Sequence, residues 1–150
     1  MKWKKFNAAV IDEFRRKGGK VARFGGLPLI VLQTVSATSS QRLDVPLIPV
    51  FDERSMFVFA TNAGSQQDPD WVENLRCQPE ISVEYEQSIV RARIAELPRA
   101  DADVLLQAKA VDSQQLQDYL KSASPRQVPV FEVNIRPVLG SEFDGIQRVD

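Results

Sequence analysis

The sequence predicts an α+β fold built mainly from antiparallel strands, with helices inserted singly between them. Short apolar runs rich in β-branched residues alternate with turn-forming residues, which is typical of strands joined as hairpins. No Gly-x-Gly-x-x-Gly motif follows a predicted strand, so a dinucleotide-binding Rossmann fold is not expected. Because closing a sheet removes its exposed edges, we expect a small closed or partly split β-barrel.

The first half of the chain supplies one amphipathic helix and then several strands. Residues 3–17 carry apolar side chains at helical spacing and are followed by a Gly-Gly pair, which predicts a helix. Residues 29–35 form a β-branched apolar run, and residues 43–51 form a second run whose two prolines indicate an edge or a bend. After a turn at residues 52–55, residues 56–60 return as a buried strand.

The second half places helices between further strands. A helix is predicted over residues 69–77, opened by Pro69 with Asp68 as its N-cap. Residues 81–85 and 89–95 are predicted to form a second hairpin. The remaining expected elements are helices over residues 100–111 and 113–120, a strand over residues 128–135, and a patternless tail over about residues 137–150.

Composition bounds the class of protein. With 150 residues, of which 43% are hydrophobic and 26% charged, the chain is expected to be one soluble domain over residues 1–150. Its 19 basic and 20 acidic residues give a net charge of −1, so no overall field attracts nucleic acid. No apolar run predicts a signal peptide or a membrane span, and the single Cys77 suits a reducing compartment. We therefore expect a cytoplasmic protein without a nucleic-acid partner.

Histidine is absent from the sequence. Its absence excludes histidine-based catalytic triads and histidine-containing zinc sites, and one cysteine cannot build a thiolate metal cluster. No metal site is expected. If the protein is an enzyme, the difficult chemistry belongs to a bound cofactor, which the protein holds and orients.

Residues 60–75 are the strongest site candidate. A loop of small residues runs from a strand end into a helix N-terminus, which exposes backbone N–H groups to the edge of a ligand. Asn62 and Gly64 also tolerate positive φ, so a plain tight turn is the alternative. Trp71 is either a wall of the site or a core residue. Asn74 is either a wall residue or, more simply, a partner of a neighbouring backbone group.

Four segments, in this order and spacing, carry a family signal. The most specific is Ala60-Thr61-Asn62-Ala63-Gly64 followed by Pro69, Trp71, Asn74 and Leu75; the others lie within residues 6–21, 26–47 and 118–130. Together they resemble the deazaflavin-dependent nitroreductase family, whose members use coenzyme F-420 on a split β-barrel related to the FMN-binding barrels. The resemblance covers roughly residues 6–134.

The resemblance implies an oxidoreductase that passes a hydride from the deazaflavin ring to a small electron-poor acceptor, a quinone or a nitro compound. It implies that Tyr119 lies on the substrate side. It assigns the polar edge of the ring to Ala60, Thr61, Asn62, Ala63 and Gly64, the pocket wall to Pro69, Trp71 and Asn74, and the phosphate to Ser36, Thr38, Ser39, Ser40 and Arg42.

One segment departs from the family pattern. Members commonly carry Gly-Arg-Lys-Ser-Gly after the first strand, whereas residues 36–40 read Ser-Ala-Thr-Ser-Ser. Paired cations secure a phosphate by charge-assisted hydrogen bonds, so their replacement predicts a weaker hold on a charged tail. FMN is therefore an alternative to coenzyme F-420. A non-catalytic protein that binds a flavin, haem or fatty acid is an alternative to a reductase.

Two questions about partners stay open. Seven cations among the first 20 residues, with Trp3 and Phe6, suit contact with an anionic membrane at its inner face. Packing of this helix on its own domain is the favoured alternative, because an apolar helix face usually covers a core. Uncovered strand edges would allow two chains to pair as a homodimer.

Overall fold

The computed structural model describes residues 2–19, 21 and 27–135, without the side chains of residues 2–4. The tail predicted over residues 137–150 lies outside the described residues. Every other predicted element is present, with boundaries shifted by no more than three residues. The elements are α1 (Lys2–Arg16), β1 (Ile30–Val35), β2 (Arg42–Leu47), β3 (Val50–Asp52), β4 (Ser55–Phe59), the 3-10 turn η2 (Asn62–Gly64), α2 (Asp70–Cys77), β5 (Glu80–Tyr85), β6 (Ser88–Glu96), α3 (Arg99–Ala110), α4 (Gln114–Ala123) and β7 (Val130–Ile135).

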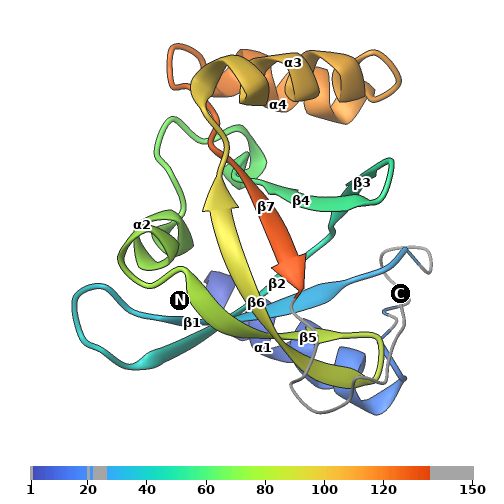
Figure 1. The fold of residues 1–150 in the computed structure, drawn as a ribbon, viewed down its shortest axis with the longest axis vertical. Coiled ribbons are helices and arrows are strands. Elements are labelled where there is room, and N and C mark those ends of the chain that lie inside the picture. Colours follow the sequence, from blue (N-terminus) through green and yellow to red (C-terminus); the bar gives the residue numbers. More distant parts are fainter. Residues whose placement is uncertain (1, 20, 22–26, 136–150) are drawn as a thin grey trace.

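The described strands form one seven-stranded sheet in the order β2-β1-β5-β6-β7-β4-β3, with antiparallel pairing throughout. The two edge strands, β2 and β3, are consecutive in the chain and are joined only through Ile48 and Pro49. The sheet therefore curls into a half-barrel (Figure 1). The prediction of a bent edge segment over residues 43–51 is confirmed, because Pro46 lies in edge strand β2 and Pro49 separates it from β3.

Apolar packing fills the inside of the curl and covers parts of its outside. Ile30, Leu32, Val83 and Phe131 meet inside, where Trp71 of α2 joins them. On the outside, α3 and α4 pack over β4 and β7 (Figure 1). Strand alternation explains both layers, because neighbouring residues of β4 and β7 face opposite sides of the sheet.

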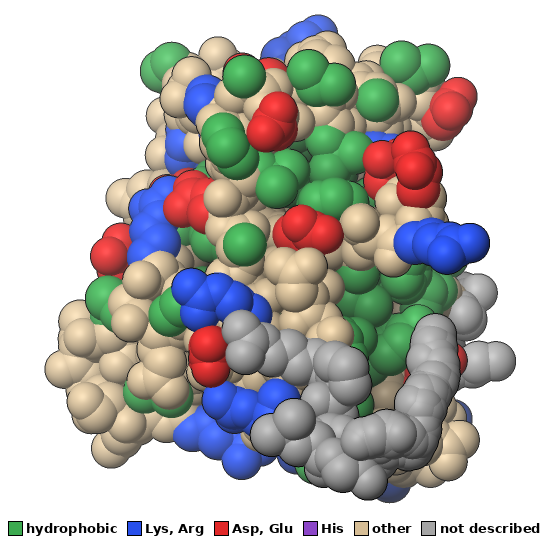
Figure 2. Space-filling model, viewed as in Figure 1, with side chains coloured by type: hydrophobic (Ala, Val, Ile, Leu, Met, Phe, Trp, Pro, Cys, Tyr) green, Lys and Arg blue, Asp and Glu red, His purple; other side chains and the backbone are tan. Residues whose placement is uncertain are grey.

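Helix α1 covers the outer face of β1. Val10, Ile11 and Phe14 pack against Leu29 and Val31, and all five side chains are buried. The apolar face of α1 is thus used within its own fold, as the favoured interpretation of the sequence expected. No helix in the described part of the chain combines the length and apolarity that crossing a membrane requires. Positive and negative side chains lie interspersed on the face shown in Figure 2.

The start of α2 differs from the prediction. Pro69 occupies the N-cap position, and no side chain caps the helix. The carboxylate of Asp68 instead accepts a hydrogen bond from Nη1 of Arg126 at 2.6 Å. The predicted N-cap role of Asp68 is therefore wrong, because a nearly buried guanidinium binds this carboxylate more strongly than a neutral backbone N–H would.

Candidate functional site

The loop after β4 has a backbone shape that concentrates N–H groups. Thr61 is in the right-handed helical region, with φ −69° and ψ −29°, and the next three residues have positive φ: Asn62 49°, Ala63 53° and Gly64 82°. A right-handed residue followed by left-handed ones forms a concave nest of successive N–H groups that favours anions and carbonyl oxygens. The tolerance for positive φ expected at Asn62 and Gly64 is confirmed.

Three N–H groups of this loop are available to a ligand. Gly64 N–H donates to the Thr61 carbonyl and Ser65 N–H to the Asn62 carbonyl, each at 2.9 Å. Among the described residues, none accepts a hydrogen bond from the N–H of Thr61, Asn62 or Ala63. Asn62 and Ala63 are also exposed. The loop can therefore bind the acceptor edge of a ligand without breaking a bond of its own.

Gly64 fixes this loop against α4. A Cβ atom at Gly64 would lie 3.0 Å from Cβ of Ser122 and 3.3 Å from Cα of Tyr119. Only glycine combines the positive φ with so close an approach to a helix backbone. The structure thus brings the ring-edge candidates, residues 60–64, next to Tyr119, whose side chain is half-buried.

Arg126 holds the same loop from behind. Its Nε donates to the Ser65 carbonyl at 3.0 Å, and its Nη2 donates to the Thr61 carbonyl at 2.8 Å. Its Nη1 donates to the Ala60 carbonyl at 3.1 Å and to Asp68 at 2.6 Å. The sequence reasoning missed Arg126, because its partners lie 58 to 66 positions away in the chain and no local pattern marks it.

The Ser-rich loop after β1 uses its N–H groups internally. Ser36 accepts three of these hydrogen bonds. Its hydroxyl accepts from the N–H groups of Thr38 and Ser39, and its carbonyl accepts from the N–H group of Ser40. Ser36 N–H donates to the Gln41 carbonyl at 2.8 Å, and Gln41 N–H donates to the Ser39 hydroxyl. The remaining N–H group, that of Ala37, donates to the side chain of Asn74, which lies outside the loop. All six N–H groups of residues 36–41 therefore have acceptors.

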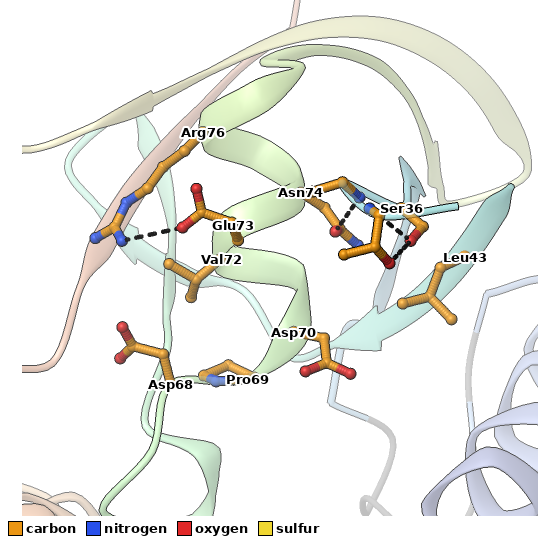
Figure 3. A pocket seen from close by; sticks show the side chains of 11 residues that line it. Ser36, Leu43, Asp68, Pro69, Asp70, Val72, Glu73, Asn74 and Arg76 are labelled. Carbon is orange, nitrogen blue, oxygen red and sulfur yellow. Dashed lines mark hydrogen bonds and ion pairs between the residues drawn. The ribbon is translucent and has the colours of Figure 1, made fainter. Parts of the chain in front are cut away.

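Asn74 of α2 ties that loop to the helix. Its Oδ1 accepts from Ala37 N–H at 2.9 Å, and its Nδ2 donates to the Thr34 hydroxyl at 3.2 Å. Figure 3 shows Asn74 reaching from α2 toward the loop that carries Ser36. Asn74 is buried, and both of its bonds are structural, as the simpler interpretation of this residue expected.

Arg42, assigned to the phosphate, and Trp71, assigned to the pocket wall or the core, both make contacts within the protein. The Arg42 guanidinium donates two hydrogen bonds to the Asp44 carboxylate, from Nε to Oδ1 at 2.6 Å and from Nη2 to Oδ2 at 2.9 Å. Trp71 is 6% exposed, and its ring lies 5.8 Å from that of Phe131 between centroids. Its packing fits the core interpretation.

A groove of about 350 Å³ lies between the Ser36 loop and α2 (Figure 3). It brings together four of the predicted site residues, Ser36, Thr38, Pro69 and Asn74. Its charged lining is Asp68, Asp70, Glu73 and Arg76. The Arg76 guanidinium is already paired with Glu96, at 2.8 and 2.9 Å, and lies 3.8 Å from Glu73. The groove therefore has more negative than positive charge available to a ligand.

Comparisons with known proteins place the chain in a family and a fold. A family model described as F420H(2)-dependent quinone reductase matches residues 6–134. A solved F420-H2 dependent reductase is 22% identical with a TM-score of 0.60, over 71% of this chain and 94% of its own. A domain-swapped dimer is 21% identical with a TM-score of 0.60, over 89% and 98%. HutZ, the heme storage protein of Vibrio cholerae, is 16% identical with a TM-score of 0.51, over 85% and 89%.

At these identities the solved structures show the fold alone, which is a split β-barrel of mainly antiparallel strands. The predicted fold class is thereby confirmed. The search of curated proteins gave no match.

Proposed function

The chain belongs to the F420H(2)-dependent quinone reductase family, and we propose that it reduces a small electron-poor acceptor of the quinone class at the loop formed by residues 60–64. The match over residues 6–134 carries the family, and with it the reaction class of an oxidoreductase and coenzyme F-420 as the cofactor. The observation that carries the location is the set of three N–H groups, of Thr61, Asn62 and Ala63, that have no acceptor within the described part of the chain.

The open loop fits the ring end of this cofactor. A deazaflavin ring presents carbonyl oxygens along its polar edge, and the nest at residues 61–63 presents donors with no described acceptor. When bound, the reduced cofactor supplies a hydride. The protein's own part is to hold the ring edge through the N–H groups of Thr61, Asn62 and Ala63, and to leave space beside the ring for the hydride-accepting substrate. Tyr119 is proposed for the acceptor side because Gly64 packs on its backbone.

The Ser36 loop offers less to the phosphate end. Its N–H groups are all bonded, and Arg42 is engaged with Asp44. The exposed hydroxyls of Thr38, Ser39 and Ser40 are the donors left for a phosphate, and two of them already share a hydrogen bond, Thr38 with the Ser36 hydroxyl and Ser39 with Gln41 N–H. The carboxylates of the neighbouring groove oppose an anion there. We therefore propose that residues 36–42 contact the phosphate only weakly, and that most of the affinity for the cofactor comes from the ring end.

The experiment is a titration of the purified protein with coenzyme F-420 and, separately, with FMN, followed by ring fluorescence. We expect saturable binding of F-420, and then oxidation of the reduced cofactor that depends on an added quinone. A nitroaromatic acceptor, tested in parallel, defines the range of acceptors. Binding without turnover would favour the non-catalytic alternative, and absence of saturable binding would contradict the proposed site.

For partners, a homodimer has more support than membrane contact. The fold is shared with a protein solved as a domain-swapped dimer, and among the described strands β2 and β3 each have a neighbour on one side only. The apolar face of α1 is buried against β1, so a membrane would meet mainly exposed cations such as Lys5, Arg16 and Lys17. Light scattering after size exclusion measures the mass directly, and a monomer at every concentration would contradict the homodimer.

A further inference from the structure

We propose that Arg126 positions the ring-edge loop, by holding loop carbonyls so that the N–H groups of Thr61, Asn62 and Ala63 are presented to the acceptor edge of the bound ring. The inference rests on the proposed function of this loop. It adds a residue that lies behind the site and acts through the backbone, without touching cofactor or substrate itself.

The guanidinium clamps both sides of the nest. At the start of the nest it binds the carbonyls of Ala60 and Thr61, at 3.1 and 2.8 Å. After the nest it binds the Ser65 carbonyl at 3.0 Å and the Asp68 carboxylate at 2.6 Å. The Arg126 side chain is only 10% exposed, so these bonds form where water competes little. One side chain therefore fixes the distance between the two ends of the loop.

Peptide planarity converts this hold into N–H orientation. In a trans peptide the carbonyl of one residue and the N–H of the next lie in one plane and point in opposite directions. Holding the Ala60 carbonyl therefore turns the Thr61 N–H away from Arg126, and holding the Thr61 carbonyl turns the Asn62 N–H away likewise. The third peptide is fixed from within, because the Asn62 carbonyl accepts from Ser65 N–H at 2.9 Å. Each free N–H thus belongs to a peptide whose carbonyl is bound.

The loop needs such a clamp because its conformation is unfavourable by itself. Asn62 and Ala63 are not glycines, yet they have φ of 49° and 53°. Non-glycine residues keep a positive φ only where surrounding contacts hold them. A cation on the carbonyls also polarises the peptides toward stronger N–H donation. Asp68 balances the buried charge of Arg126 and keeps its fork in place.

The test compares Arg126→Met with Arg126→Lys, Asp68→Asn and a control, Arg15→Met. Arg126→Met removes every donor of the side chain. Arg126→Lys keeps the positive charge but loses the planar guanidinium that reaches several acceptors at once. Asp68→Asn keeps the bonds from Arg126 to the carbonyls. The control removes a comparable hydrogen-bonded cation, one that binds Glu84 and Asp44 between α1 and the sheet. Readouts are the dissociation constant of oxidised F-420, the KM values for cofactor and quinone, the unfolding midpoint, and the amide shifts of residues 61–63 without ligand.

We expect Arg126→Met to weaken F-420 binding by about tenfold or more, because the loss of two oriented hydrogen bonds is of that size. The KM for the cofactor should rise while the KM for the quinone stays unchanged, and the amide shifts of residues 61–63 should move. Arg126→Lys and Asp68→Asn should fall between this variant and the wild type. Arg15→Met should lower the unfolding midpoint without changing the dissociation constant.

A folded Arg126→Met with unchanged F-420 affinity and unchanged amide shifts would overturn the proposal. If that variant does not fold, Arg126→Lys and Asp68→Asn decide, and wild-type affinity together with wild-type shifts in both would overturn it. A wild-type protein that binds no F-420 would refute the proposed function instead. The amide shifts of the variants would then still show whether Arg126 sets the loop.

Discussion

The loops at residues 36–41 and 60–65 each follow a strand of the same curled sheet, yet they use their backbone N–H groups in opposite ways. In the Ser-rich loop, hydroxyls and carbonyls of the loop itself, with Asn74, accept all six N–H groups. In the second loop, three N–H groups have no acceptor among the residues that the structure describes, while Arg126 holds the carbonyls. A polar loop is thus not by itself an anion site. In the first loop the hydroxyls of Ser36 and Ser39 accept N–H groups of the loop, whereas in the described structure no side chain of residues 60–64 accepts one in the second loop.

The largest effect is expected at the contact that seats the open loop on α4. Gly64→Val should lower the free energy of unfolding by about 3 kcal/mol, because it adds left-handed strain to a clash with Ser122 and Tyr119. Urea denaturation measures the loss. Ala63→Gly is the matched control, since glycine suits the positive φ of 53° at this position, and it should keep or raise stability. A Gly64→Val protein as stable as the wild type would show that the loop is not held against α4.

The closed loop should open when its outside anchor is removed. Asn74→Ala deletes the acceptor of Ala37 N–H and the donor to Thr34 inside a buried site, which should destabilise the protein by about 2 kcal/mol. Hydrogen exchange of the Ala37 amide should become faster. Asn134→Ala, at an exposed position of β7, should change stability by less than about 0.5 kcal/mol. Unchanged exchange at Ala37 would mean that the loop closes without Asn74.

The difference between the loops predicts how each contributes to cofactor affinity. Ala37→Arg combined with Thr38→Lys adds two cations to the closed loop, and we expect F-420 to bind about tenfold more tightly. A deazaflavin riboside without phosphate is the control ligand, and its affinity should not change. Equal tightening of both ligands, measured by ring fluorescence, would contradict a phosphate contact at residues 36–42.

Glu84 belongs to neither loop and gives a separate test of global stability. Its titration should have the smallest effect on stability near neutral pH. The hydrogen bond from Arg15 is the main cause that lowers the pKa of Glu84 below its ordinary value of 4.5, and Gln33 adds to it. A lowered folded-state pKa means that this stabilisation is complete above pH 4.5 and is lost as the pH falls through the folded value. Urea midpoints should therefore stay flat near neutrality and fall in acid.

Glu84→Gln is the variant that checks this assignment. It should be less stable at neutral pH and should show a shallower acid decline, because the titrating group is gone. The stability of both loops should fall by the same amount, because the hydrogen bonds of Arg15 to Glu84 and Asp44 join α1 to the sheet and touch neither loop. An acid decline as steep as that of the wild type would assign the pH dependence to other carboxylates.

The fold could be predicted closely because hydrophobic periodicity and turn residues are local signals. The division of residues 43–51 into two strands was less visible, although Pro46 and Pro49 indicated the bend. The positive φ at Asn62 and Gly64 was also predicted from local residue types. Trp71 could not be assigned, because an aromatic residue suits a core and a pocket wall equally in sequence. Arg126 could not be found, because its role depends on contacts that only the folded chain creates.

Strand β7 is the last strand of the described chain, yet it lies between β4 and β6 in the sheet. When only the first 120 residues have left the ribosome, β4 can pair with β3 and β6 with β5, but each of them still lacks its second neighbour. Arg126, which holds the carbonyls of the open loop, is synthesised just before β7. Sheet closure and loop ordering are thus expected to occur together once β7 has emerged, so the cofactor site forms only when this strand has joined the sheet.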